Sequence, residues 1–94
     1  MDKILNNLGL CKRAGGLISG SELVIEGIRA KKVLYVFLAN DASDNTKKKI
    51  LDKSKYYNVE DCSNYSSLEL SQAIGVVGKM VIGITNKDFL KILK

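Results

Sequence analysis

The sequence has 94 residues, of which 46% are hydrophobic and 27% are charged; this balance is typical of a folded domain, and the length leaves no room for a second core. Lys and Arg outnumber Asp and Glu by 15 to 10, and the resulting net charge of +5 favours an anionic partner. The absence of His, Trp and Pro removes the commonest general base, the commonest metal ligand and any Pro-rich linker.

The N-terminal part of the chain predicts a helix followed by a short strand. Apolar side chains at helical spacing, from Ile4 to Cys11, predict a helix over 2–12. Gly15 and Gly16 end this helix, and the apolar pair at 17–18 predicts a brief strand.

The next segment predicts a second helix and the strongest strand in the chain. Ser19 followed three residues later by Glu22 is the pattern of a capping box, so we expect a helix that begins here and ends at Lys31 and Lys32. The run 33–39 is apolar at every position, which predicts a strand covered on both faces.

The central part of the chain predicts a third helix and a third strand. The turn at 40–43 offers residues that cap helices, and the helix that follows runs to about Tyr57, with Thr46, Ile50, Ser54 and Tyr57 along one line. A short strand is expected at 59–62, before a polar loop at 63–67.

The C-terminal part predicts two more helices around a buried strand. Ser66 or Ser67 caps a short helix that Gly75 ends, the apolar run 80–84 predicts a strand, and Asn86 caps a terminal helix. Helices and strands alternate with short connections over residues 1–94. We therefore expect an α/β fold, a single-domain three-layer α/β/α sandwich with a central sheet of about four strands.

Cysteine usage and hydropathy indicate the compartment. Cys11 and Cys62 are too far apart for a CxxC pair, so we expect both to be reduced, buried thiols. The first residues lead into an amphipathic stretch and not into the apolar region of a signal peptide, and the longest apolar runs are too short to span a bilayer. A cytoplasmic protein without a membrane partner is expected.

The residue types present argue against catalysis. An activated nucleophile needs a base to take its proton, and neither Cys11 nor any serine has a His partner in this chain. Asp41 and Asp44 suit a magnesium ion no better than they suit helix capping. We expect no catalytic residue, no metal site and no cofactor, and an enzyme that uses these two carboxylates is the least favoured alternative.

The start of the second predicted helix is the most informative segment for function. A helix N-terminus exposes unpaired N–H groups and a partial positive charge, which suit a phosphate or a base-edge acceptor. Gly20 has no side chain to hold RNA away, Ser21 adds a hydroxyl, and Glu22 offers an acceptor that suits a guanine edge. Lys12 and Arg13 could lie nearby and hold the RNA backbone. An ordinary capped helix after a glycine turn is the alternative that these residues leave open.

A series of short motifs follows in order along nearly the whole chain. They are Leu8-Gly9-Leu10, Arg13-Ala14-Gly15, Ser19-Gly20, Ala39-Asn40-Asp41-Ala42-Ser43, Asn45-Thr46-Lys47-Lys48-Lys49-Ile50, Tyr57-Asn58-Val59, Leu70 with Ala73-Ile74-Gly75, and Ile84-Thr85-Asn86. In this order and spacing the chain resembles the bacterial YlxQ-like branch of the ribosomal protein L7Ae superfamily.

This resemblance implies a non-enzymatic RNA-binding protein that recognises kink-turns or related internal loops in structured RNA, ribosomal RNA included. It implies a face in which the turn corresponding to Gly20, Ser21 and Glu22 contacts the guanines of sheared G·A pairs, and the turn at Asn40 and Asp41 completes that face. The loop residues Tyr65, Ser66, Ser67 and Leu68 are expected to pack on a flipped-out nucleotide. Such recognition of unstacked bases is how RNA is generally read.

Further expectations concern phosphates and partners. Lys12, Arg13 and, more weakly, Lys32 are expected to contact phosphates, and the protein to be a ribosome-associated monomer. Tyr65 has two possible roles: its ring stacks on a base, or it is a partly buried anchor of the loop. Glu26 stands where the family's kink-turn binders have Lys, and this favours the main alternative, a protein-interaction module with the same fold that has lost specific RNA binding.

Overall fold

The central sheet of the computed structural model, which describes residues 2–93, has four strands. In spatial order they are β1 (Leu17–Ser19), β4 (Val81–Ile84), β2 (Tyr35–Leu38) and β3 (Glu60–Cys62). β4 is antiparallel to both β1 and β2, whereas β3 is parallel to β2. The sheet is therefore mixed, and its two edges are the short strands β1 and β3.

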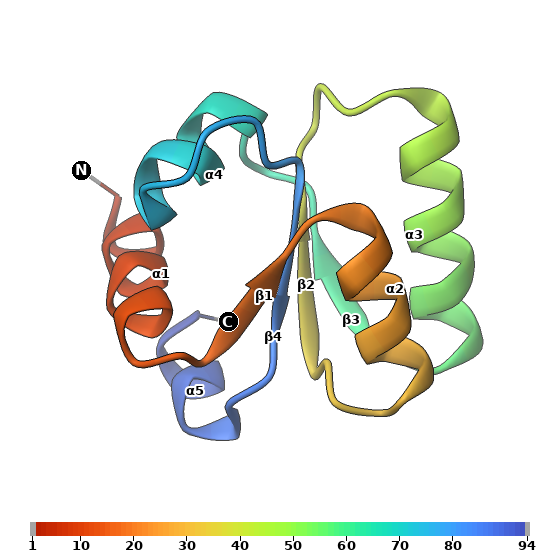
Figure 1. Ribbon diagram of the computed structural model, residues 1–94, viewed down its shortest axis with the longest axis horizontal. Helices are drawn as coiled ribbons and strands as arrows, with labels where there is room; N and C mark the ends of the chain where they lie inside the picture. Colours follow the sequence, from red (N-terminus) through yellow and green to blue (C-terminus); the bar gives the residue numbers. More distant parts are fainter. Residues whose placement is uncertain (1, 94) are drawn as a thin grey trace.

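Helices cover both faces of the sheet (Figure 1). On one face lie α1 (Lys3–Arg13), α4 (Ser67–Ile74), the 3-10 turn η1 (Lys87–Phe89) and α5 (Leu90–Leu93), and α1 contacts both α4 and α5. On the other face α2 (Ser21–Arg29) packs against α3 (Asp44–Tyr56). The predicted three-layer α/β/α sandwich is confirmed, because each layer buries its apolar side against the sheet.

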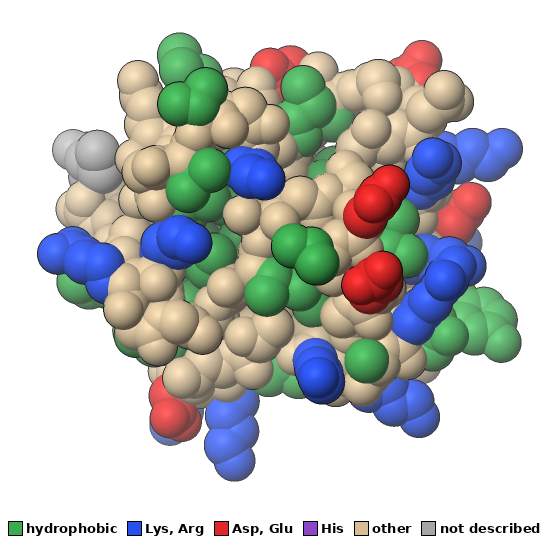
Figure 2. All heavy atoms as spheres, viewed as in Figure 1, with side chains coloured by type: hydrophobic (Ala, Val, Ile, Leu, Met, Phe, Trp, Pro, Cys, Tyr) green, Lys and Arg blue, Asp and Glu red, His purple; other side chains and the backbone are tan. Residues whose placement is uncertain are grey.

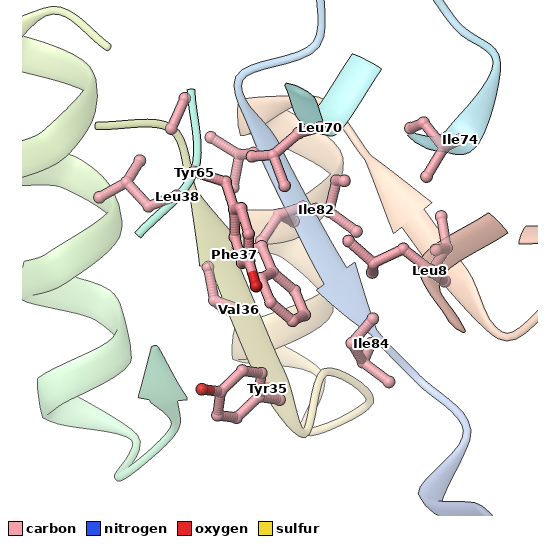
Figure 3. Packing of buried hydrophobic residues seen from close by; sticks show 14 of the residues in the cluster. Leu8, Tyr35, Val36, Phe37, Leu38, Tyr65, Leu70, Ile74, Ile82 and Ile84 are labelled. Carbon is pink, nitrogen blue, oxygen red and sulfur yellow. The ribbon is translucent and has the colours of Figure 1, made fainter. Parts of the chain in front are cut away.

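The side chains of β2 alternate between the two layers of helices (Figure 3). Phe37 lies at the centre of the core on the α1 and α4 side, where its ring centroid is 5.2 Å from that of Tyr35 and 6.3 Å from that of Tyr65. Val36 and Leu38 point to the α3 side and are also buried. The run predicted as a strand over 33–39 is regular strand only at 35–38, although its flanking N–H groups still bond to β4 residues or their neighbours.

The capping box predicted at the start of α2 is wrong. Ser19 is the last residue of β1 and pairs with Ile82, so Gly20 becomes the N-cap residue. A capping box forms at α4 instead, where the Ser66 hydroxyl accepts from the Glu69 N–H at 3.1 Å and the Glu69 carboxylate accepts from the Ser66 N–H at 3.0 Å. Ser19 therefore belongs to the strand and not to the helix start, because its pairing with β4 outweighs the local capping pattern.

Both cysteines are free, as expected, but only Cys11 is fully buried. Cys62 is partly exposed because it lies on the edge strand β3, so the prediction of two buried thiols is wrong for this residue. Burial raises the pKa of the Cys11 thiol to about 11. No helix within residues 2–93 is both long and apolar enough to cross a lipid bilayer.

The sheet has two ends at which different loops gather (Figure 1). At the upper end β1, β2 and β3 finish and β4 begins; at the lower end α1, α2 and α3 finish and lead into those same three strands. These two ends carry the residues that sequence analysis selected.

Candidate functional site

α2 begins at the upper end with backbone N–H groups that no side chain caps. Its N-cap residue, Gly20, has φ +103° and provides no side-chain hydrogen bond. Asp2, Ser43 and Ser66, by contrast, cap α1, α3 and α4 through side-chain oxygens. The N–H groups at residues 21–23 therefore carry the partial positive charge of the helix start and are available to an acceptor from outside.

Lys79 lies beside this helix start, and sequence analysis missed it. Its ammonium nitrogen is 3.7 Å from the position that a Cβ on Gly20 would take. The two residues meet because the Gly20 N–H donates to the Val81 carbonyl at 2.9 Å, where β1 pairs with β4. A cation thus stands next to the uncapped helix, whose first turn also carries the exposed carboxylate of Glu22.

The backbone of Lys79 is fixed by a side chain of α4. The buried Ser71 hydroxyl donates to the Lys79 carbonyl at 3.1 Å and accepts from the Lys79 N–H at 3.0 Å. Ser71 thereby fixes the position of the Lys79 backbone in the loop between α4 and β4.

The turn after β2 is tied to the start of α4 at the same end. The Asp41 carboxylate accepts from the Ser67 N–H and the Ser67 hydroxyl, both at 2.8 Å. These hydrogen bonds hold the pKa of Asp41 below its ordinary value. The Asn40 N–H also donates to the Tyr65 carbonyl at 2.9 Å. The predicted turn and the predicted loop are therefore brought together, with Asp41 holding them in place.

Tyr65 anchors its loop in the core, which is the second of the two roles considered from the sequence. Its side chain is only 9% exposed and its ring packs against Phe37 (Figure 3). Its hydroxyl donates to the Asp2 carboxylate at 3.2 Å, and burial together with this hydrogen bond raises the pKa of Tyr65 to about 12. A stacking role is contradicted because the ring fills the core.

Apolar side chains are exposed next to this anchor. Leu68 is 65% exposed and Val77 is 95% exposed. They line a shallow groove of about 460 Å³ between α4 and the loop at 75–78. Gly75 and Gly78 bracket this part of the loop in the left-handed region, with φ +73° and +76°. Those two glycines are the one sequence signal that could have marked the loop as a candidate.

The three predicted phosphate contacts lie at the lower end, away from Gly20. Lys12 and Arg13 occupy the last turn of α1, and Lys32 follows α2. The nine residues of α2 span about 13 Å, and Lys32 lies beyond its far end. The expectation that Lys12 and Arg13 lie near Gly20 is wrong, because β1 carries the chain from the lower to the upper end before α2 begins.

The two carboxylates considered for catalysis do not form a site. Asp41 is engaged by Ser67, and Asp44 is exposed in the first turn of α3. Within residues 2–93, no group of three or more Cys, Asp or Glu side chains is placed to hold a metal ion.

Two curated relatives match most of this chain. An RNA-binding protein YlxQ of Enterococcus faecium is 51% identical over 89 residues, which cover 95% of this chain and 85% of the relative. An RNA-binding protein YlxQ of Bacillus subtilis (strain 168) is 40% identical over 82 residues, covering 87% and 82% respectively.

Solved structures share the same fold. A Bacillus halodurans C protein, described as having unknown function, superposes with a TM-score of 0.94 at 35% identity and covers 99% of this chain and 94% of its own. The Giardia lamblia 15.5kD RNA binding protein superposes with a TM-score of 0.81 at 20% identity, covering 97% and 78%. A family model matches residues 2–94. The chain therefore belongs to the Ribosomal protein L7Ae/L30e/S12e/Gadd45 family.

Proposed function

We propose that this chain is a non-enzymatic protein that binds a kink-turn or a related internal loop of structured RNA through its upper end. The observation that carries this proposal is the uncapped start of α2 with Lys79 beside it. The relatives that are 51% and 40% identical are both named RNA-binding proteins, which supports the class of partner.

The chemistry of the helix start suits an RNA loop with exposed base edges. The free N–H groups at 21–23 donate to phosphate oxygens or base acceptors, and Ser21 adds a hydroxyl that donates or accepts. The Glu22 carboxylate accepts from the N–H groups of a guanine edge. Lys79 offsets the repulsion between that carboxylate and nearby phosphates. Gly20 leaves the backbone open to close approach because it has no side chain.

The surrounding loops supply shape and apolar contact. Asn40 and Asp41 on one side and Ser66 and Ser67 on the other border the same end of the sheet. The hydrogen bonds from the Asn40 N–H to the Tyr65 carbonyl and from Ser67 to the Asp41 carboxylate pre-organise this end. Leu68, together with the Val77 loop, offers an apolar surface to an unstacked base. Leu68 and Val77, and not Tyr65, would therefore cover the flipped-out base.

The lower-end cations suit a longer RNA. The molecule measures 31 × 26 × 18 Å, so an RNA arm that continues from the upper end along the α1 side of the sheet reaches Lys12 and Arg13, whereas an arm on the α2 side reaches Lys32. Replacing Arg13 by Ala should then weaken long-armed RNAs and shrink their salt slope by somewhat under one, with no effect on a minimal internal loop. We expect a cytoplasmic monomer acting on ribosomal or other structured RNA.

The test is a binding comparison between a kink-turn RNA and the same RNA with its G·A pairs replaced by Watson–Crick pairs. The proposal expects at least about tenfold tighter binding to the kink-turn, a difference of roughly 1.4 kcal/mol. Equal affinity for both RNAs, or none for either, removes the kink-turn assignment.

The exposed apolar groove favours one alternative, a partner protein at the same end. Recovery of a protein that stays bound after nuclease treatment and is released by Val77→Ser would favour this alternative over RNA binding.

A further inference from the structure

A second pocket lies at the lower end of the molecule, on the other side of the sheet from Lys12 and Arg13. It has a volume of about 370 Å³ and lies where α2 and α3 finish side by side. Leu34 and Tyr57 give it apolar walls, and Lys31 and Asn58 border it. The upper-end site does not use any of these residues.

The two helices end at this pocket in the same way. The Lys32 N–H donates to the Gly27 carbonyl at 2.8 Å, and the Val59 N–H donates to the Ser54 carbonyl at 2.7 Å. Each closure puts the preceding residue in the left-handed region, with φ +60° at Lys31 and +58° at Asn58. Glycine takes this conformation without cost and Asn tolerates it, whereas a lysine is strained there. The backbone conformation at position 31 does not favour a lysine. The reason for a lysine at this position is therefore to be sought in what its side chain contacts.

An exposed aromatic ring stands beside the pocket. Tyr56 is 79% exposed, although its ring is held edge-on against Tyr57, with 4.9 Å between centroids and 69° between planes. Tyr57 lines the pocket, so Tyr56 presents an oriented ring at its margin. A tyrosine with most of its ring in water is suited to stacking on a nucleobase.

Basic residues lie at the ends of the two helices, and one of them, Lys31, lines the pocket. The last turns of the two helices and the connection after α2 contribute Arg29, Lys31, Lys32, Lys53 and Lys55. The acidic groups nearby in the chain are Glu26, Asp52, Glu60 and Asp61, and Asp52 lies one helical turn before Tyr56 on the same face of α3. Figure 2 shows Lys and Arg side chains along the right side of this face and at its lower right, with acidic side chains among the upper ones. The helix ends carry partial negative charge, which accounts for some of these cations but not for the exposed ring among them.

We propose that this lower-end surface binds a single-stranded segment of RNA, with phosphates held by Lys31, Lys53 and Lys55 and a base stacked on Tyr56. The inference extends the proposed function, since it gives the same RNA, or its flanking strand, a second point of attachment. The positive charge selects a polyanion, and the oriented ring selects one that carries flat, unstacked bases.

The absence of Trp from the chain provides a direct probe. In a Tyr56→Trp variant the single indole should be quenched on titration with an oligouridine of about ten nucleotides, the length range of single-strand sites. Lys31→Gly should then weaken the oligouridine several-fold without loss of fold, because glycine relieves the left-handed strain. Lys48→Ala, at an exposed lysine elsewhere on α3, is the matched loss of one charge and should weaken binding less.

The outcomes separate this inference from the proposed function. Absence of quenching, equal losses in Lys31→Gly and Lys48→Ala, or equal quenching by polyglutamate would each overturn the lower-end surface. Kink-turn affinity of Lys31→Gly for a minimal RNA should match that of the parent chain. If oligouridine binding fails while the kink-turn preference holds, only the further inference falls; if the kink-turn preference fails while the indole is still quenched, only the upper-end proposal falls.

Discussion

Ser71 and Lys79 are joined by two hydrogen bonds, in which the serine hydroxyl donates to the lysine carbonyl at 3.1 Å and accepts from the lysine N–H at 3.0 Å. This buried hydroxyl connects α4 to the backbone of Lys79, two residues before β4. Among the described residues, Lys79 provides the only cation found within 4 Å of the Gly20 Cβ position. The upper-end site thus depends on a side chain that is itself inside the protein.

Replacing Ser71 by Ala should destabilise the fold by about 1–3 kcal/mol, because the Lys79 N–H and carbonyl lose their partner. It should also weaken RNA binding through the displaced lysine. The control is Ser54→Ala on α3: the Ser54 hydroxyl is also buried but has no hydrogen-bond partner among residues 2–93, so its removal should be neutral or stabilising. Urea denaturation of both variants checks this, and equal losses would contradict it.

Neutralising Lys79 should weaken RNA binding while the fold is retained. Lys79→Gln keeps most of the side-chain length but removes the charge beside α2. The slope of log affinity against log salt concentration should therefore decrease by about the amount expected for one phosphate contact. Filter binding over a salt series measures this slope. Lys48→Gln is the control with the same charge change on an exposed helix face; an identical effect of both variants would show general attraction instead of a local contact.

The Tyr65 hydroxyl should make the stability of the fold depend on pH in the alkaline range. Its pKa of about 12 lies above the ordinary value of 10.0, so the folded protein holds this proton more tightly than the unfolded chain. The stabilisation is complete below about pH 10 and is lost as pH rises towards 12. Tyr65→Phe should lose about 1 kcal/mol at neutral pH and should show a flatter alkaline decline. Tyr56→Phe, at an exposed ring, should decline like the parent chain, and three parallel curves would refute the assignment.

Asp41 should contribute a stabilisation that is lost at acid pH, whereas that of Tyr65 is lost at alkaline pH. Because Ser67 donates twice to its carboxylate, the pKa of Asp41 in the folded protein lies below its ordinary value of 3.8. The stabilisation is therefore present above the ordinary range and is lost as pH falls through the lower, folded value. The difference in stability between the parent chain and Asp41→Ala should shrink over this acid range. Denaturation curves at successive pH values measure it, and a constant difference would exclude the carboxylate as its source.

The fold was predictable because its signals are local. The apolar run around Val36 and the capping residues Ser43 and Ser66 mark strands and helix starts within a few residues of themselves. The prediction failed at Ser19 because the local capping pattern was outweighed by long-range pairing with Ile82 in β4.

The candidate site was only half predictable, because its second half comes from pairing between residues far apart in the sequence. Gly20 is marked by its own neighbours, whereas Lys79 reaches it only through the β1–β4 ladder and the Ser71 hydroxyl. Arg13 is close to Gly20 in the sequence, yet β1 carries the chain from one end of the sheet to the other between them. The burial of Tyr65 depends on Phe37 and Asp2, which no local pattern near residue 65 indicates.

Amide chemical-shift mapping during titration with a kink-turn RNA locates the RNA-binding surface residue by residue. The largest shifts are expected at the N–H groups of residues 20–23, with further shifts at Lys79 and Leu68, and small changes in the core of the sheet. Shifts confined to other surfaces, with residues 20–23 unchanged at saturation, would contradict the upper-end site.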